Sequence, residues 1–318
     1  MRMLQQADAG SFDAKTLLFV ALGLTGVWYL YVLLRGLKIA RVDRGEVVAP
    51  TVGGIATGAF TNFWDTLGVG SFATTTAIFR QWKMVRDEQI PGVLNIGHTL
   101  PTIVQAYLFT KLVPVDTVTL ISMIAAAVLG SYLGAGFVAG WSRKRVQLVM
   151  GTLLFFAAVL FVMKAGQFMP GGGTALALTG PKLIIGVVGN FMLGALMTMG
   201  IGLYAPCMIL IYLLGMDPKA AFPIMMGSCA FLMPVASARF IKEKAFDARA
   251  VVALAVGGVP AVFLAVYVFS SLPIVWMLWL VTIVVLYTSV TMLMAARRTQ
   301  EIASIATADE AGAHLKVT

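Results

Sequence analysis

The sequence predicts an all-α polytopic membrane protein with one N-terminal helix followed by two repeats of four elements. Three observations predict this fold class. First, 59% of the 318 residues are hydrophobic and 12% are charged, whereas a soluble domain has about 25% charged residues. Second, long apolar stretches recur along the whole chain, with no room between them for a separate soluble domain. Third, the two longest stretches carry glycines at their centres.

Nine apolar segments can be drawn, and most are suited to a single helical crossing of about 20 residues. Segments 50–79 and 182–214 do not fit this description because they are long and broken by glycines. The nine segments are 16–34, 50–79, 89–110, 115–141, 146–163, 182–214, 219–238, 250–270 and 274–296.

The two glycine-broken segments are related to each other by a shift of 132 residues. The same order continues beyond them, and the third and fourth elements follow at nearly the same shift. The matching pairs are Gly54 with Gly186, Gly68 with Gly200, Gly70 with Gly202, Ala73 with Ala205, Pro91 with Pro223 and Asp116 with Asp247. We therefore divide the chain into an N-terminal helix with a basic loop (1–49), a first repeat (50–163), a linker (164–181), a second repeat (182–296) and a polar cytoplasmic tail (297–318).

The positions of Lys and Arg favour a particular topology. If all nine segments cross the membrane, the 23 basic residues divide 14 to 9 between the two sides. If the two broken segments instead enter and return on the same face, they divide 17 to 6. The second division obeys the positive-inside rule much better, so we favour seven crossings, two re-entrant or discontinuous hairpins and inverted repeats. Two kinked but complete spans remain the alternative.

The net charge of +9 has the same origin and does not indicate nucleic-acid binding, because the basic residues gather in short loops between apolar segments. The two cysteines, Cys207 and Cys229, lie in apolar segments without a Cys/His cluster. We therefore expect neither a metal site nor a cofactor.

The glycine motifs "DTLGVGS" and "TMGIGLYAP" should each break a helix and expose peptide N–H groups. N–H groups at the start of a helix attract anions. Two breaks entering from opposite faces would direct these groups at one central volume. The alternative is that the small residues only allow close helix packing.

Polar side chains are concentrated in the first repeat. The shift places Asn62 opposite Gly194, Asp65 opposite Met197 and His98 opposite Ala230. Polar groups deep in a membrane are costly and usually face the protein interior. For His98, a structural role with the ring bonded to a nearby carbonyl is an equal alternative, and Cys229 can be a packing residue. The candidate binding residues are Asn62, Asp65, Thr66, Gly68, Gly70, Ser71, His98, Gly200, Gly202, Tyr204, Ser228 and Cys229.

The second half, "GMDPKAAFPIMMGSCAFLMPVASARFIKEKAFDARAV", follows the break at "GIG" and resembles the repeat unit of the TauE/SafE sulfite exporter family. That unit has a broken helix with glycines, a turn with Pro, a small polar stretch and a basic loop before an Asp. The matching residues are Gly200, Gly202, Pro218, Gly227, Ser228, the basic loop 239–244 and Asp247, with Gly68 and Gly70 in the first half. The resemblance implies a transporter of sulfite, organosulfonates or related sulfur-containing anions.

The expected function is therefore secondary transport of small anions across the bacterial cytoplasmic membrane, by alternating access at a central site between the repeats. Backbone N–H groups near both breaks would hold the anion. The candidate partners are the anion, protons, the lipid bilayer and a second copy of the chain. A non-transporting membrane assembly or scaffold protein is the alternative. An intramembrane enzyme ranks below both because no nucleophile–base pair is evident.

Asp65 has two interpretations that the sequence leaves open. Beside the central cavity, its negative charge would repel an anionic substrate, so that binding of the anion and of a proton would favour each other. Alternatively, it caps the helix that follows the break by accepting backbone N–H bonds.

Overall fold

A computed structural model shows the fold and describes residues 14–138, 147–149, 151–152, 155–156, 158–159, 162–163, 173–197, 202–271, 276, 279 and 282–297. Within these residues the regular structure is helical apart from one isolated bridge between Ala175 and Met216. The labelled elements are α1 (Ala14–Asp43), α2 (Val52–Thr66), α3 (Ser71–Gln81), η1 (Asp87–Gln89), α4 (Ile90–Leu112), α5 (Thr117–Val138), α7 (Gly180–Met197), α8 (Tyr204–Leu213), η2 (Pro218–Ala220), α9 (Ala221–Lys242) and α10 (Ala248–Ser271).

Four of the described helices are long and apolar enough to cross a membrane, judged by length and composition: α1, α7, the stretch Pro218–Lys242 and α10. Large apolar side chains such as Leu24, Val27 and Tyr267 are exposed on α1 and α10. Such exposure is a liability in water and expected in lipid. The prediction of an all-α membrane protein is confirmed over the described residues.

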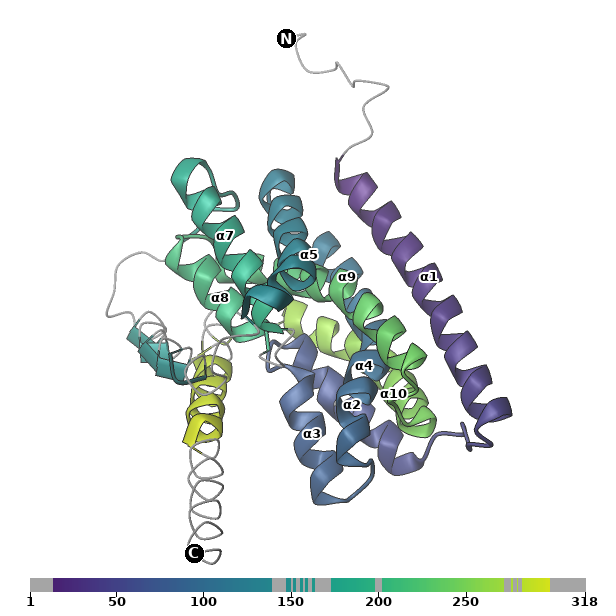
Figure 1. Cartoon of the computed structure of the whole chain (residues 1–318). Helices are drawn as coiled ribbons and strands as arrows, with labels where there is room; N and C mark the ends of the chain where they lie inside the picture. Colours follow the sequence, from purple (N-terminus) through teal and green to yellow (C-terminus); the bar gives the residue numbers. More distant parts are fainter. Residues whose placement is uncertain are drawn as a thin grey trace, which may run out of the picture.

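The first glycine-broken segment forms two helices separated by a break, and in the second segment residues 198–201 lie outside the described part. Gly68 and Gly70 lie between α2 and α3 with φ values of +102° and +84°, a left-handed conformation that favours glycine. In the second segment, α7 ends at Met197 and α8 begins at Tyr204. Figure 1 shows α2 beside α3 and α7 beside α8, and the members of each pair contact one another.

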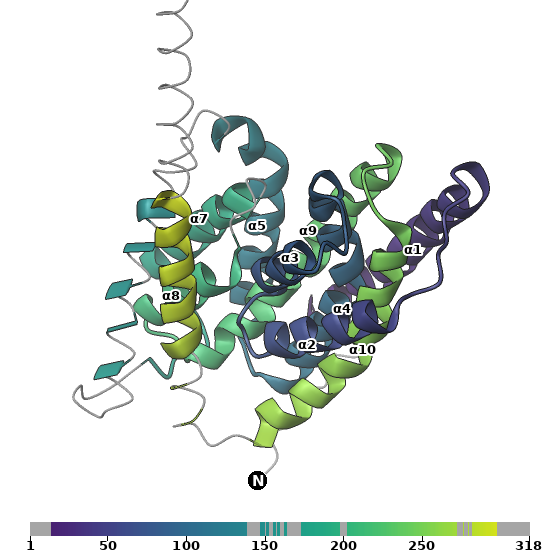
Figure 2. The ribbon, with the colours of Figure 1, turned by 90° about the horizontal axis from the view of Figure 1, so that it is seen from below.

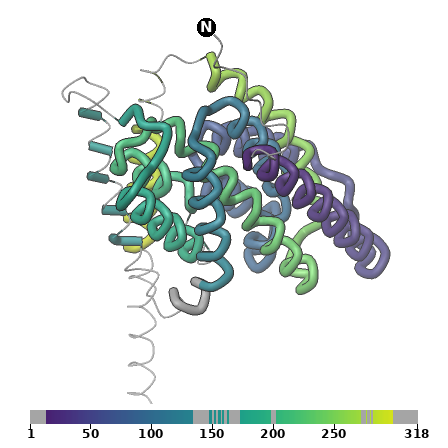
Figure 3. Tube along the Cα trace, turned by 90° about the horizontal axis from the view of Figure 1, so that it is seen from above, coloured from purple at the N-terminus to yellow at the C-terminus, as the bar shows by residue number. Residues whose placement is uncertain are grey.

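Helices of the first half of the chain pack mainly against helices of the second half. The two most extensively packed pairs are α2 with α10 and α5 with α7, and α4 packs against α9 between them. Glycines allow the backbones to touch, since a Cβ added at Gly257 would collide with the carbonyl oxygen of Ile55, and one added at Gly194 would collide with that of Ala127. The views from below and above place α1 at the edge away from α7 and α8 (Figures 2 and 3).

We expect Gly194→Ala to lower the free energy of unfolding by about 1–3 kcal/mol, because the α5–α7 contact must open to admit a methyl group. Gly23→Ala in α1 is the matched control, since a Cβ there meets no atom within 4 Å. Thermal unfolding of both variants in the same detergent checks the prediction. Equal stability of the two variants would show that the α5–α7 contact is not tight in the folded protein.

Candidate functional site

The two breaks meet in the interior of the protein. Gly68, in the first break, lies against α8, because a Cβ added there would be 3.4 Å from the terminal methyl carbon of Met208. Tyr204, the first residue of α8, donates a hydrogen bond from its hydroxyl to Gln105 Oε1 of α4 at 3.2 Å. The starts of α3 and α8 are therefore close neighbours, although about 130 residues separate them in the sequence.

Asp65 lies at the end of α2 and caps α3. Its Oδ1 accepts a hydrogen bond from the N–H of Ser71, the first residue of α3, at 2.6 Å. Its Oδ2 accepts a second bond from Gln105 Nε2 at 2.9 Å. All three residues are buried. The capping interpretation of Asp65 therefore describes one of its two oxygens, and the other oxygen faces α4.

Gln105 joins the first break to the second. Its Nε2 donates to Thr66 Oγ1 at 2.8 Å as well as to Asp65, while its Oε1 accepts the Tyr204 hydroxyl. The result is a continuous hydrogen-bonded chain, Ser71–Asp65–Gln105–Tyr204, which we call the central chain. It connects the start of α3 with the start of α8.

No cation accompanies the Asp65 carboxylate in the described part of the protein. The ion pairs found there are Arg44–Glu46, Arg80–Asp87 and Arg239–Glu243, all in or beside loops. A buried carboxylate is stabilised when N–H donors surround it. Asp65 obtains this from Ser71 and Gln105, with the Tyr204 hydroxyl as a further partner.

His98 belongs to a second buried network, about two turns closer to the start of α4 than Gln105. Its Nδ1 lies 3.0 Å from Asn62 Oδ1 and its Nε2 lies 3.0 Å from Thr75 Oγ1. Asn62 Nδ2 donates to the Gly58 carbonyl at 2.8 Å, which leaves the amide oxygen facing the ring. This arrangement assigns the hydrogen to Nδ1 and makes Nε2 the acceptor of the Thr75 hydroxyl. The ring is thus bonded to side chains of α2 and α3, where a carbonyl partner was the expected structural alternative.

Ser228 and Cys229 lie in α9 and contact α7. Ser228 Oγ donates to the Ile224 carbonyl at 2.7 Å and accepts from Asn190 Nδ2 at 3.2 Å. Cys229 Sγ lies 3.8 Å from the sulfur of Met197, the last residue of α7. Cys229 is therefore beside the second break, whereas Ser228 takes part in the packing between α7 and α9.

The glycines of the two breaks differ in their surroundings from the packing glycines. A Cβ added at Gly70 or at Gly202 would meet no atom within 4 Å. Gly200 lies outside the described residues. The expected set of anion-binding N–H groups needs one correction, since the Ser71 N–H is already bonded to Asp65 and the Gly68 N–H to the Asp65 carbonyl at 2.8 Å. Among the described residues the Gly70 N–H has no such partner, and in the first turn of α8 only Tyr204 and Ala205 offer an N–H, since Pro206 has none and the Cys207 N–H is bonded to the Leu203 carbonyl at 3.0 Å.

Sequence reasoning did not place three residues in the candidate site. Gln105, Thr75 and Asn190 are not among the candidate binding residues predicted from the sequence. Each is a fully buried polar residue in an apolar segment, and this was the available signal. Within the described residues no group of three His, Cys, Asp or Glu side chains is arranged to hold a metal ion.

Long apolar helices that expose their side chains, together with buried polar side chains between them, are typical of multi-pass α-helical membrane proteins. Residues 182–315 match the family described as Sulfite exporter TauE/SafE. The match confirms the resemblance over this part of the chain and indicates a membrane transporter of the sulfite-exporter type. Searches of the curated proteins and of the solved structures returned no match.

Proposed function

We propose that the protein is a secondary transporter of small anions, with sulfite, organosulfonates and related sulfur-containing anions as the substrate class. The central chain carries the proposal, because it links the starts of two broken helices, one from each half, at a buried position. Helix starts expose N–H groups and carry the positive end of the helix dipole, and both features favour an anion. The family match over residues 182–315 supports the substrate class.

The anion would lie beside Gly70 and Gly202, where the structure leaves space next to the backbone. The N–H groups of Gly70, at the start of α3, and of Tyr204 and Ala205, at the start of α8, would donate to its oxygen atoms. The Tyr204 hydroxyl would add a side-chain donor once it leaves Gln105. Asn62, Thr66 and His98 would hold the break in shape, since their polar atoms are bonded to one another or to nearby backbone and side chains.

Symmetric contacts support two inverted repeats, 50–163 and 182–296. The pair α2 with α10 corresponds to the pair α7 with α5 under the repeat shift. Asp116 and Asp247 have the same role, since each accepts the N–H of the residue three positions later, at 2.9 and 2.8 Å. Movement of one repeat relative to the other would then expose the centre to each side of the membrane in turn.

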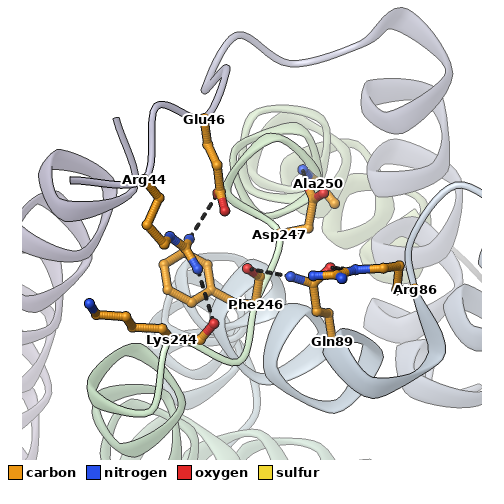
Figure 4. Close-up of polar contacts among 8 residues, drawn as sticks. All are labelled: Arg44, Glu46, Arg86, Gln89, Lys244, Phe246, Asp247 and Ala250. Atoms are coloured by element: carbon orange, nitrogen blue, oxygen red, sulfur yellow. Dashed lines mark hydrogen bonds and ion pairs between the residues drawn. The ribbon is translucent and has the colours of Figure 1, made fainter. Parts of the chain in front are cut away.

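Contacts among the basic loops support the topology with seven crossings. Arg44 Nη1 donates to the Lys244 carbonyl at 3.0 Å, and Gln89 Nε2 donates to the Phe246 carbonyl at 3.2 Å (Figure 4). The loops before α2, after α3 and after α9 therefore meet at one place. If 50–79 were a complete span, the first two of these loops would lie on opposite sides of the membrane. We assign this face to the cytoplasm.

We expect single cysteines at positions 41 and 83 to have the same accessibility. The Arg41→Cys and Lys83→Cys variants, each in a background lacking Cys207 and Cys229, should resist an impermeant maleimide added to intact cells and react after permeabilisation. Lys111→Cys is the control for the outer face and should react at once. Opposite labelling of positions 41 and 83 would exclude the hairpin model and restore nine crossings.

Transport itself is tested with purified protein in liposomes, using radiolabelled sulfite and a panel of sulfonates and carboxylates at a fixed membrane potential. Protein-dependent, saturable movement of at least one of these anions is the expected result. A non-transporting scaffold protein in the bacterial cytoplasmic membrane is the competing proposal. Protein that is correctly inserted but moves none of these anions would favour it.

A further inference from the structure

A cleft of two adjoining pockets lies where the loops before α2, after α3 and after α9 meet. The pockets have volumes of about 420 and about 410 Å³ and share Glu46, Met84 and Asp247. We call them together the loop cleft. The first pocket is also lined by Val47, Thr51, Gly54, Phe79, Arg249 and Ala250, and the second by Lys83, Val85, Arg86 and Gln89.

Both acidic side chains of the loop cleft are already bonded. Glu46 Oε2 accepts a hydrogen bond from Arg44 Nη2 at 2.8 Å, in an ion pair. Asp247 Oδ1 accepts the Ala250 N–H at 2.8 Å and so caps α10. The Glu46 carboxylate is held toward Arg44, whose guanidinium lies over the Phe246 ring (Figure 4). Neither carboxylate needs a cation from the cleft.

The basic side chains of the loop cleft, which are Lys83, Arg86 and Arg249, have no ion-pair partners among the described residues. Arg86 Nε donates only to the neutral Gln89 Oε1, at 3.3 Å. The positive-inside rule explains the side of the membrane on which these cations lie, but it does not explain why they line a cavity. The cleft therefore has three basic side chains without an ion pair against one such acid, Asp247, which is bonded to a main-chain N–H.

The wall of the loop cleft also has an apolar part. Val47, Phe79 and Met84 line it, with Phe79 fully buried. A cavity of this size that combines apolar side chains with a few charged groups suits an organic ligand better than a bare inorganic ion. Its chemistry matches an anionic head with a small apolar body.

The corresponding junction of the second repeat is closed in a different way. There the loop before α7 is held by main-chain groups, since the Asp217 N–H donates to the Ala175 carbonyl at 3.0 Å and the Asp116 N–H donates to the Leu176 carbonyl at 2.9 Å. At the loop cleft, side chains span the equivalent junction, as Arg44 and Gln89 do. The repeat architecture alone therefore does not require a cleft at this place.

We propose that the loop cleft is a docking site for small organic anions on the cytoplasmic face, separate from the central site. Lys83 and Arg86 on one wall and Arg249 on the other would hold a sulfonate or carboxylate group, while Met84 would contact the apolar body. The ligand class rests on the proposed function. Binding to the cleft is nevertheless measurable without transport.

The test follows alkylation of a single cysteine, Val47→Cys, by a neutral maleimide in nanodiscs of phosphatidylcholine, in a background lacking Cys207 and Cys229. Benzenesulfonate should slow the reaction in a saturable manner. The double variant Lys83→Gln/Arg86→Gln should raise the concentration for half protection at least about tenfold, because two charge-assisted contacts are lost. The matched control, Lys38→Gln/Lys242→Gln, removes the same charge outside the cleft and should leave protection unchanged.

Absence of protection, or equal weakening in both double variants, would overturn the proposal. So would protection caused by phosphatidylglycerol in the nanodisc that benzenesulfonate cannot displace, since a lipid headgroup would then be the occupant. Failure of the proposed function is a separate result. In that case liposomes would show no anion movement while protection at Val47→Cys could still be present.

Discussion

Gly202→Val should lower anion transport at least about tenfold, equivalent to about 1.4 kcal/mol, while the protein stays inserted and monodisperse. Among the described residues, a Cβ added at Gly202 would meet no atom within 4 Å. The described neighbours therefore leave space for a larger side chain. The side chain would occupy the space next to the start of α8 where we place the substrate. A loss of transport would then reflect the ligand and not the fold.

Gly70→Val should have the same effect on transport, with added strain. Gly70 has a φ of +84°, and left-handed backbone costs a residue with a side chain about 1–2 kcal/mol. Gly45→Val controls for this strain, because Gly45 has a φ of +63°, also faces open space and lies in a loop. Initial rates in liposomes and size-exclusion profiles provide the two readouts. Normal transport by both Gly70→Val and Gly202→Val would mean that the glycines do not approach substrate, and the central site would have to be abandoned.

Much of the helical fold could be predicted from local features of the sequence. The expected segment 115–141 corresponds to α5, which is described as Thr117–Val138, because apolar length is a local property that the membrane imposes on a helix. The breaks were equally predictable, since Gly68 and Gly70 have φ values that other residues rarely adopt. The distribution of Lys and Arg along the sequence favours one face of the membrane for all the basic loops, independently of the contacts of Arg44 and Gln89.

The partners of the buried polar side chains could not be predicted. Gln105 lies 40 residues from Asp65 in the sequence and reaches it only because α4 packs near the first break. Tyr204 comes from the other half of the chain and bonds to the same amide. Composition shows that such residues need partners in a membrane, but the choice of partner depends on how distant helices pack. For this reason the sequence left both interpretations of Asp65 open, and the structure shows one oxygen capping α3 and the other bonded to Gln105.

Asp65→Asn should separate the capping role of Asp65 from its role in the central chain. An asparagine at position 65 can still accept the Ser71 N–H through its amide oxygen, because Asn caps helices as well as Asp. Its NH2 group would then face the NH2 group of Gln105, so the second bond is lost. Rotating the Gln105 amide would not repair the network, because Nε2 also donates to Thr66 Oγ1. After the rotation the amide oxygen would face Thr66 Oγ1, whose own hydrogen is already donated to the Asn62 carbonyl at 2.7 Å.

We therefore expect Asp65→Asn to keep α3 intact and to slow transport about tenfold, the cost of one buried bond to a charged group.

The negative charge of Asp65 also leads us to expect a pH dependence of anion binding. A carboxylate beside the site repels the anion, so wild-type binding should take up a proton and strengthen as the pH falls. The neutral amide removes this repulsion, so the variant should bind the anion with a flat profile between about pH 5 and pH 8 and move no proton with it. Gln105→Leu is the matched variant, because it breaks the same bond but keeps the carboxylate. It should slow transport and retain the pH dependence. The test is to measure substrate affinity and proton flux across this pH range for all three proteins. If wild type and Asp65→Asn have identical pH profiles and equal transport rates, Asp65 acts as a helix cap alone.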